Sequence, residues 1–347
     1  MDILINPTNK CNFACTFCSA AELPANTLSF QDTIKLLAPY KKNLKRLIFN
    51  GGDPLMMSPE YYLSLIKWCE HEIDNPVYLS LTTNLWDFYL NPNKWKALLS
   101  HEKVGITTSF QYGDDRRVIT PTGVKPYTED KFRKVLELFY FIAGYYPTFI
   151  YVVDYKNEND IIKALKLAKE YKIRCRINKK VSVGRASNDY YPRYRIFEQY
   201  IKIIEAGYIN YEMNCCTTLK HIFTNKKDYC CDYDRNCCNH MVVINPDKSV
   251  VSCCFLSQMV NEYNKKRYDM SIDTNNKYAF AKENHSIKPE CLTCNNFDIC
   301  NSCRMYIKEV KDSIENMDEY CVKMKYYTEK LRKTFMSHIN EIDYREY

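Results

Sequence analysis

Three cysteines lie close together near the start of the chain. Cys11, Cys15 and Cys18 follow a C-x3-C-x2-C spacing, and Phe17 directly precedes the last of them. A [4Fe–4S] cube is ordinarily held by four thiolates, so three thiolates leave one iron open to a small molecule. The alternative is an incomplete zinc knuckle, but zinc sites use paired Cys or Cys/His sets, and no fourth ligand lies near this run. The pattern therefore favours an iron–sulfur cluster with one open iron.

A second group of cysteines occupies the last third of the chain. Cys291, Cys294, Cys300 and Cys303 follow a C-x2-C-x5-C-x2-C spacing, and Cys321 follows after 17 further residues. Three adjacent pairs lie upstream: Cys230/Cys231, Cys237/Cys238 and Cys253/Cys254. Because neighbouring side chains point in different directions, one member of each pair is expected to bind metal. Structural zinc remains an alternative, although zinc ribbons separate their two C-x2-C knuckles by a longer loop.

The composition indicates the cellular compartment and the classes of partner that the protein could bind. The chain has 347 residues, 18 cysteines and a net charge of +7. It contains no apolar run of the length that a signal peptide or a membrane helix requires, so we expect a cytoplasmic protein without a membrane partner. Disulfides are rare in that compartment, which favours metal ligation for the many cysteines. No basic stripe interleaved with aromatic residues indicates nucleic acid.

Strand and helix patterns alternate over the first 200 or so residues. The expected strands are 3–6, 46–50, 77–83, 105–111, 148–153 and 174–178, and the expected helices are 30–38, 59–71, 92–99, 129–143, 158–171 and 194–206. Alternation of this kind indicates βα units around a parallel sheet, whose ligands bind at the carboxyl ends of the strands. We expect an α/β fold, a partial (β/α)6 TIM-like barrel at 1–207, a cysteine-rich domain at 208–325 and a helical tail at 326–347.

The early motifs together resemble the radical S-adenosylmethionine (SAM) superfamily. Cys11-x3-Cys15-x2-Cys18 with Phe17 is similar to its cluster motif, and Gly51-Gly52-Asp53-Pro54 after the second strand is similar to its Gly-Gly-Glu-Pro motif. The resemblance implies a [4Fe–4S] cluster on the three cysteines and S-adenosylmethionine on the open iron. The backbone carbonyls of the glycine motif would bind the amino group of the methionine moiety, and glycine permits that close approach.

Further positions match the superfamily more loosely. The resemblance places Phe17, Asn84, Ser109, Arg116 and Arg117 at the cofactor, with Asn84 and Ser109 at the ends of the third and fourth strands. One of the two arginines would pair with the cofactor carboxylate through a bidentate contact. The turn 183–186 resembles one that approaches the adenine. The alternative for each position is a surface or capping residue.

The distal cysteines resemble a SPASM domain, which holds auxiliary [4Fe–4S] clusters. Two residues separate its third and fourth cysteines here, where the family has three, and Lys248 stands where the family has glycine. The family's ligand order implies two auxiliary clusters and hence three clusters in all. The first would use Cys231, Cys238, Cys253 and Cys303, and the second would use Cys291, Cys294, Cys300 and Cys321.

The resemblance implies an oxidoreductase-type radical SAM enzyme that matures a ribosomally made peptide. We expect a thioether or carbon–carbon crosslink in the product. A different outcome is epimerisation, in which the surplus thiol of Cys254 acts as the catalytic hydrogen donor. The same clusters would also suit a small-molecule dehydrogenase, a cofactor-biosynthesis enzyme, or a non-catalytic iron–sulfur or zinc protein. Sulfatase maturation is disfavoured, because Cys254 or Phe255 stands where that branch has a basic aspartate.

The expected partners follow from the same resemblance. They are a precursor peptide and a reductant of the flavodoxin or ferredoxin type. Only ten residues precede Cys11, which leaves no room there for a fused leader-binding domain. We therefore expect either a separate leader-binding protein or recognition built into the barrel.

Overall fold

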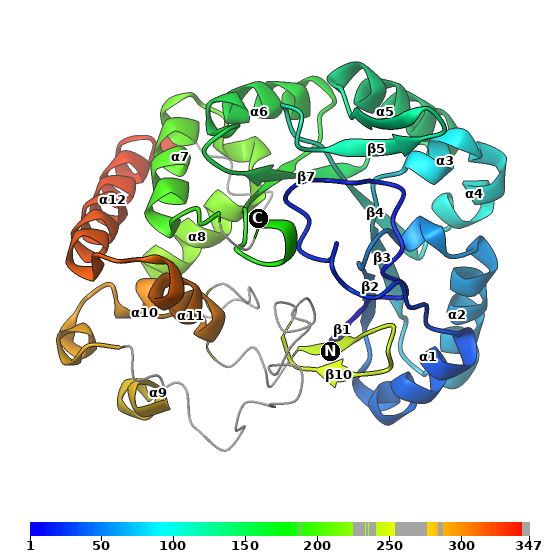
Figure 1. The fold of residues 1–347 in the computed structure, drawn as a ribbon, viewed down its shortest axis with the longest axis horizontal. Coiled ribbons are helices and arrows are strands. Elements are labelled where there is room, and N and C mark those ends of the chain that lie inside the picture. Colours follow the sequence, from blue (N-terminus) through cyan, green and yellow to red (C-terminus); the bar gives the residue numbers. More distant parts are fainter. Residues whose placement is uncertain are drawn as a thin grey trace. The chain divides into compact units, whose positions relative to one another are not determined.

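A computed structural model, drawn in Figure 1, describes residues 1–186, 189–224, 233, 235, 241–253, 276–283 and 287–341. The chain divides into two compact units. The first consists of Met1–Tyr151, Val183–Asn188 and His240–Arg267. The second consists of Val152–Ser182, Asp189–Asn239 and Tyr268–Tyr347. The domain ranges expected from the sequence, 1–207, 208–325 and 326–347, stay predictions.

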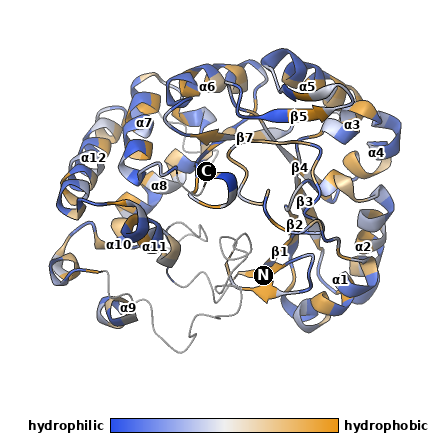
Figure 2. Ribbon diagram, in the orientation of Figure 1, coloured by the Kyte–Doolittle hydropathy of each residue, from blue (hydrophilic) through white to orange (hydrophobic). Residues whose placement is uncertain are grey.

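A parallel sheet forms the centre of the first unit. Its strands are β1 (Asp2–Ile5), β2 (Arg46–Phe49), β3 (Tyr78–Thr82), β4 (Val104–Ser109), β7 (Thr148–Val153), β9 (Val242–Ile244) and β10 (Val250–Val251). They lie in the order β10-β9-β1-β2-β3-β4-β7, and only β9 and β10 pair antiparallel. Apolar side chains line these strands, as the orange colouring of β7 and β10 in Figure 2 shows. Their burial supplies the main stabilisation of the sheet.

Helices follow the strands of the first unit in the expected alternation. They are α1 (Phe30–Leu37), α2 (Pro59–Glu72), α3 (Trp86–Leu90), α4 (Pro92–Leu99) and α5 (Glu129–Ala143). The residues at the two ends of α5 explain where this helix begins and ends. The Thr128 hydroxyl accepts a hydrogen bond from the Lys131 N–H at the amino end, as N-caps do. Gly144 ends the helix with φ of 80°, a left-handed conformation that glycine adopts readily.

The second unit contains the last barrel strand and most of the later helices. Its elements are β8 (Cys175–Lys179), α6 (Ile161–Glu170), α7 (Arg193–Glu205), α8 (Met213–Thr224), α9 (Lys277–Glu283), α10 (Phe297–Cys300), α11 (Arg304–Ser313) and α12 (Met317–Ser337). Within this unit, the N–H of Lys180 donates to the carbonyl oxygen of Val153 at 2.9 Å, so the end of β8 lies beside the end of β7. Helices α7 and α12 pack together through stacked rings of Tyr194 and Tyr327, 6.0 Å apart.

The expected fold class is confirmed: an α/β fold with a parallel sheet, of the partial (β/α)6 type, with a cysteine-rich region after it. The six expected strands are all present, with ends that differ by one or two residues. The sequence patterns did not predict the hairpin β5 (Arg117–Thr120) and β6 (Gly123–Pro126) or the strand β9. Within the described part of the chain, no helix is long and apolar enough to cross a membrane.

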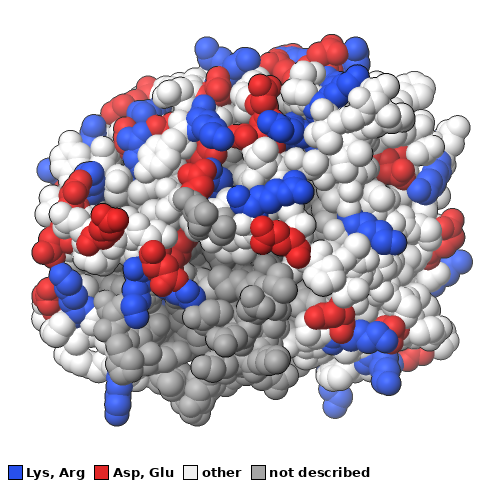
Figure 3. All heavy atoms as spheres, viewed as in Figure 1, with Lys and Arg blue, Asp and Glu red and all other residues white. Residues whose placement is uncertain are grey.

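Charged side chains of both signs are interspersed on the face drawn in Figure 3. Among the described residues on that face, no patch of one sign gathers. The described charges on that face therefore form no electrostatic footprint of a single sign.

Candidate cluster and cofactor site

The loop that follows β1 carries the three early cysteines. Cys15 is buried, and Cys11 and Cys18 are partly exposed. Burial raises the pKa of the Cys11 thiol, and the nearby charge of Asp53 raises it further. Burial likewise raises the pKa of Cys18. Thiolates at these positions need a positive partner, which a bound iron ion would provide.

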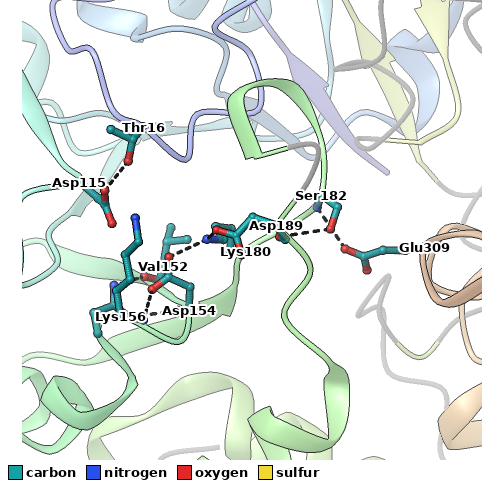
Figure 4. A network of polar contacts seen from close by, with 10 residues as sticks. Thr16, Asp115, Val152, Asp154, Lys156, Lys180, Ser182, Asp189 and Glu309 are labelled. Atoms are coloured by element: carbon teal, nitrogen blue, oxygen red, sulfur yellow. Dashed lines mark hydrogen bonds and ion pairs between the residues drawn. The ribbon is translucent and has the colours of Figure 1, made fainter. Parts of the chain in front are cut away.

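The hairpin β5–β6 holds one side of this cysteine loop. The Ala14 N–H donates to the Arg117 carbonyl oxygen at 2.8 Å, and the Thr16 N–H donates to the Asp115 carbonyl oxygen at 2.9 Å. The Thr16 hydroxyl also donates to the Asp115 carboxylate at 2.5 Å, as Figure 4 shows. The loop thus pairs with β5 as a short extra strand would, which fixes the backbone between the cysteines. No turn signal in the sequence pointed to this pairing.

The turn 183–186 holds the other side of the loop. The Arg185 N–H donates to the Cys18 carbonyl oxygen at 3.2 Å, and the Arg185 guanidinium donates to the Cys15 carbonyl oxygen at 3.1 Å. Gly184 has φ of +62°, and a Cβ there would lie 2.5 Å from the Ser19 carbonyl oxygen. Only glycine fits so close an approach. The sequence expectation for this turn concerned adenine; the structure places the turn against the cysteine loop.

The Gly51-Gly52-Asp53-Pro54 turn follows β2 and lies against the residues just before Cys11. The Gly52 N–H donates to the Thr8 carbonyl oxygen, and the Asp53 N–H donates to the Lys10 carbonyl oxygen, each at 2.9 Å. A Cβ on Gly52 would lie 2.5 Å from the Asn9 carbonyl oxygen. The glycine is therefore required by sterics, because its backbone touches the backbone that leads into the cysteine loop.

The side chain of Asp53 ties the ends of β2 and β3 together. It is 2% exposed and accepts hydrogen bonds from the Leu55 N–H at 2.9 Å, the Thr83 hydroxyl at 2.8 Å and the Asn84 N–H at 2.7 Å. Burial raises the pKa of Asp53 to about 6. The carboxylate oxygens already accept hydrogen bonds from the protein, which leaves the backbone at this position to bind a ligand.

Asn84 extends the same network to the cysteine loop. Its side-chain N–H donates to the Asn12 side-chain oxygen at 2.7 Å and lies 3.8 Å from the Cys11 sulfur. The sequence placed Asn84 at the cofactor. The structure brings it beside the first cysteine of the motif.

The structure separates the two candidate arginines. The Arg116 guanidinium donates to the Ser109 hydroxyl at 2.8 Å and lies 5.4 Å from the centre of the Phe17 ring. Arg116 is buried, and its Nε has no hydrogen-bond partner among the described residues. Arg117 is partly exposed and donates to the Asp114 carbonyl oxygen instead. Three positions expected at the cofactor, Phe17, Ser109 and Arg116, therefore meet in one place.

Gln111 was not singled out from the sequence. It lies two residues beyond Ser109, the last residue of β4. Its side chain is buried, and the carbonyl oxygen has no hydrogen-bond partner among the described residues. The strand period gives no signal for it, because β4 ends at Ser109 and both Phe110 and Gln111 are buried.

Four of the later cysteines share a cavity in the second unit. Cys291, Cys294, Cys300 and Cys321 all line a cavity of about 340 Å³. Burial raises the pKa of Cys300 to about 12, and the other three thiols contribute to the same shift. Within the described ranges, no three His, Cys, Asp or Glu side chains are grouped as ligands of a single metal ion. The spacing motif has thus brought the predicted second auxiliary set together around one space.

The other predicted auxiliary ligands are divided between the units or lie outside the described residues. Cys303 is buried at the start of α11 in the second unit, and Cys253 belongs to the first unit. Cys231 and Cys238 lie outside the described residues, as does Cys254, the candidate catalytic thiol. The first auxiliary set therefore stays a prediction from sequence.

A buried charge cluster marks the carboxyl ends of β7 and β8. The Lys180 ammonium donates to the Asp154 carboxylate at 2.7 Å and also pairs with Asp189, as Figure 4 shows. Its neighbour Lys179 pairs with Glu309 at 2.5 Å. Each lysine charge is matched by a carboxylate, which is how buried charges are tolerated. Their role in the described structure is to join elements of the second unit.

Comparison with known proteins identifies the class. Residues 5–168 match the radical SAM superfamily. The matched stretch includes all three early cysteines and the Gly51–Pro54 turn, so this part of the chain is similar to a radical SAM domain. It is 26% identical over 222 residues to GTP 3',8-cyclase of Listeria welshimeri serovar 6b, a match that spans 60% of this chain and 63% of the cyclase.

Two solved structures share the fold over most of the chain. Native anSMEcpe with bound AdoMet matches with a TM-score of 0.72 and 19% identity over 99% of this chain and 100% of that one. SuiB of Streptococcus suis bound to S-adenosylmethionine matches with a TM-score of 0.58 and 16% identity over 89% of this chain and 74% of SuiB. At these identities the likeness concerns the fold.

Proposed function

We propose that this protein is a radical SAM enzyme and a peptide maturase, which cleaves S-adenosylmethionine reductively and takes a hydrogen atom from a ribosomally made peptide. The product would carry a thioether or a carbon–carbon crosslink. The proposal is carried by one observation: the fold match to anSMEcpe extends over 99% of this chain, and thus includes the cysteine-rich region. The anSMEcpe structure with AdoMet and the Cp18Cys peptide matches with a TM-score of 0.70. SuiB has been solved with its precursor peptide SuiA.

The early cysteine loop would hold the cluster that binds S-adenosylmethionine. Three thiols on one loop, with no fourth cysteine nearby in the sequence, are the donor set for a cube with one open iron. The loop backbone is fixed on both sides, by β5 and by the turn at Gly184–Ala186. A fixed loop suits a cluster whose ligands must hold one geometry.

The residues expected at the cofactor also fit an anionic, amino-bearing ligand. Arg116 would pair with the carboxylate of S-adenosylmethionine, since its Nε lacks a partner among the described residues while its other end is held by Ser109. The backbone of Gly51–Pro54 would receive the amino group. When bound, the cluster and S-adenosylmethionine supply the one-electron chemistry that yields 5′-deoxyadenosine and removes a hydrogen atom from the substrate.

The later cysteines would hold two auxiliary clusters. For the second set, four thiols line one cavity without forming a single-ion site among the described residues. Each thiolate of a cube binds a different iron, so its ligands lie further apart than those around one zinc ion. The resemblance of the cysteine pattern to a SPASM domain favours an iron–sulfur cluster over zinc at Cys291, Cys294, Cys300 and Cys321. For the first set, Cys231, Cys238, Cys253 and Cys303 are proposed from the ligand order that the SPASM resemblance implies.

The substrate class is open to direct test. The precursor peptide would be encoded in a neighbouring short reading frame, and a leader-binding protein and a flavodoxin- or ferredoxin-type reductant would assist. The chain should be co-expressed with that peptide, and the peptide analysed by mass spectrometry. A crosslink predicts a product lighter by two hydrogens. Epimerisation by a thiol such as Cys254 would leave the peptide mass unchanged in H2O and would add one deuterium to the peptide in D2O.

A small-molecule substrate is the second candidate, favoured by the match to GTP 3',8-cyclase. The purified enzyme should be incubated with GTP under the same reducing conditions. GTP-dependent formation of 5′-deoxyadenosine, without any change in the peptide, would contradict the peptide proposal.

A further inference from the structure

Arg193 occupies a buried position next to the cavity of the four later cysteines. It is the first residue of α7 and is 6% exposed. Its guanidinium donates to the Ile299 carbonyl oxygen at 2.7 Å and to the Ser302 hydroxyl at 2.8 Å. These two acceptors flank Cys300 in the chain. The guanidinium is therefore fixed against the turn that presents one of the proposed cluster ligands.

The surroundings hold this cation in place away from bulk water. The guanidinium carbon lies 5.0 Å from the centre of the Tyr306 ring and 4.6 Å from that of Tyr233. Such stacking stabilises a partly desolvated arginine. Because its two acceptors flank Cys300 in the chain, the buried positive charge lies beside one of the proposed cluster ligands.

The other cations that line this cavity, Lys288, Lys311 and Lys325, are exposed and therefore less able to act on its interior. Lys288 also lines it, but its side chain is 43% exposed and pairs with Asp318 at 2.7 Å. Water screens an exposed charge strongly, whereas a buried one acts through a lower effective dielectric constant. Arg193 and Lys288 thus make a natural comparison of a buried and an exposed cation beside the same cavity.

We propose that Arg193 raises the reduction potential of the cluster held by Cys291, Cys294, Cys300 and Cys321. This inference rests on the proposed function, because it requires that auxiliary cluster. Reduction adds one negative charge to a cluster, and a fixed buried cation stabilises the more negative state. A cluster with a raised potential is the better electron acceptor. Oxidation of a substrate radical to a closed-shell crosslink releases one electron and needs such an acceptor.

The reduction potential itself is the measurement. The cluster signal is followed by electron paramagnetic resonance during a redox titration of the reconstituted enzyme. In Arg193→Gln, the ratio of reduced to oxidised cluster at a fixed potential should fall at least tenfold, which for a one-electron couple is about 59 mV. Arg193→Lys keeps the charge and should keep most of the potential. Ser302→Ala removes one hydrogen bond but no charge, and Lys288→Gln removes an exposed charge; both should leave the potential unchanged.

A second variant keeps the test decisive if Arg193→Gln does not retain the cluster. In Arg193→His, the potential should rise as the pH falls through about 6.5, where an imidazole gains its charge. The proposal is overturned if the Gln variant keeps the wild-type potential, or if the Lys variant shifts as far as the Gln variant. An Arg193→His potential equal to that of the wild type at pH 8, where the imidazole is neutral, would also overturn it. If Cys300→Ala leaves the iron content of the wild type unchanged, the auxiliary cluster itself is absent, a failure of the proposed function distinct from an unshifted potential.

Discussion

The guanidinium of Arg116 donates a hydrogen bond of 2.8 Å to the hydroxyl of Ser109, at the carboxyl end of β4. Two residues that the sequence placed at the cofactor for separate reasons are thereby joined. The neighbouring Arg117 turns to the Asp114 carbonyl oxygen instead. The two arginines therefore offer a matched pair for testing cofactor binding.

Arg116→Gln should weaken S-adenosylmethionine binding about 10–100-fold. A hydrogen bond to a charged group contributes about 1.5–3 kcal/mol, and every 1.4 kcal/mol corresponds to about tenfold in Kd. Arg117→Gln should stay within about threefold of the wild type, because its partner is a backbone oxygen away from Ser109. Equilibrium binding to the reconstituted enzyme measures both. Equal losses in the two variants would show that the assignment to Arg116 is wrong.

Gly52→Ala should disrupt the early cluster. The new methyl group would lie 2.5 Å from the Asn9 carbonyl oxygen, so the backbone leading to Cys11 must move. Iron content should fall by about four per chain, the content of one cube. Gly105→Ala is the control, since its Cβ would meet nothing closer than the Leu79 carbonyl oxygen at 4.0 Å. A Gly52→Ala enzyme with full iron and normal S-adenosylmethionine cleavage would contradict the steric account.

Cys294→Ala should lower the iron content by about four per chain, the content of one cluster, while S-adenosylmethionine cleavage persists. Cleavage would persist because the early cluster has its own ligands. Cys69→Ala is the matched control, since Cys69 is buried in α2. Metal analysis together with 5′-deoxyadenosine measurement distinguishes the two variants. Finding zinc in place of iron would exclude the auxiliary cluster.

Glu212 should make stability depend on pH. It is fully buried and accepts from the N–H groups of Ile177 and Cys215, and burial raises its pKa to about 7. The folded state then holds the proton more tightly than the unfolded state, whose Glu pKa is about 4.3. Its stabilising contribution is complete below that value and is lost as the pH rises towards 7.

In the wild type, the free energy of unfolding should fall by about 3 kcal/mol as the pH rises from the unfolded pKa of Glu212 to its folded pKa. Glu212→Gln should not show this fall. Urea unfolding of both proteins at pH 5 and pH 8 measures it. The wild type should lose stability relative to the variant as the pH rises. Parallel changes in the two proteins would mean that Glu212 does not titrate in this range.

Much of the fold and part of the site could be predicted from the sequence. The alternation of apolar runs located all six barrel strands, because period-two burial along a strand is a local property. The ligand order implied by the SPASM resemblance grouped Cys291, Cys294, Cys300 and Cys321, which line one cavity. Spacing alone would have grouped Cys303 with the first three, because it completes the C-x2-C-x5-C-x2-C run.

The long-range hydrogen bonds that hold the cysteine loop could not be predicted in the same way. Asp115 bonds to Thr16, 99 residues earlier, and Arg185 bonds to Cys15, 170 residues earlier. Both depend on the tertiary arrangement of separate elements, which leaves no periodic trace in sequence. Arg193 was missed for the same reason, since its acceptors lie more than 100 residues further along the chain. Single polar residues in helix patterns look like solvated surface until their partners are known.

Anaerobic reconstitution tests the central claim most directly. The purified chain is loaded with iron and sulfide, reduced with dithionite and given S-adenosylmethionine with the precursor peptide, and the products are analysed by liquid chromatography and mass spectrometry. The account predicts about twelve irons per chain, 5′-deoxyadenosine formation, and a peptide lighter by two hydrogens. A fully loaded enzyme that forms no 5′-deoxyadenosine under these conditions would contradict it.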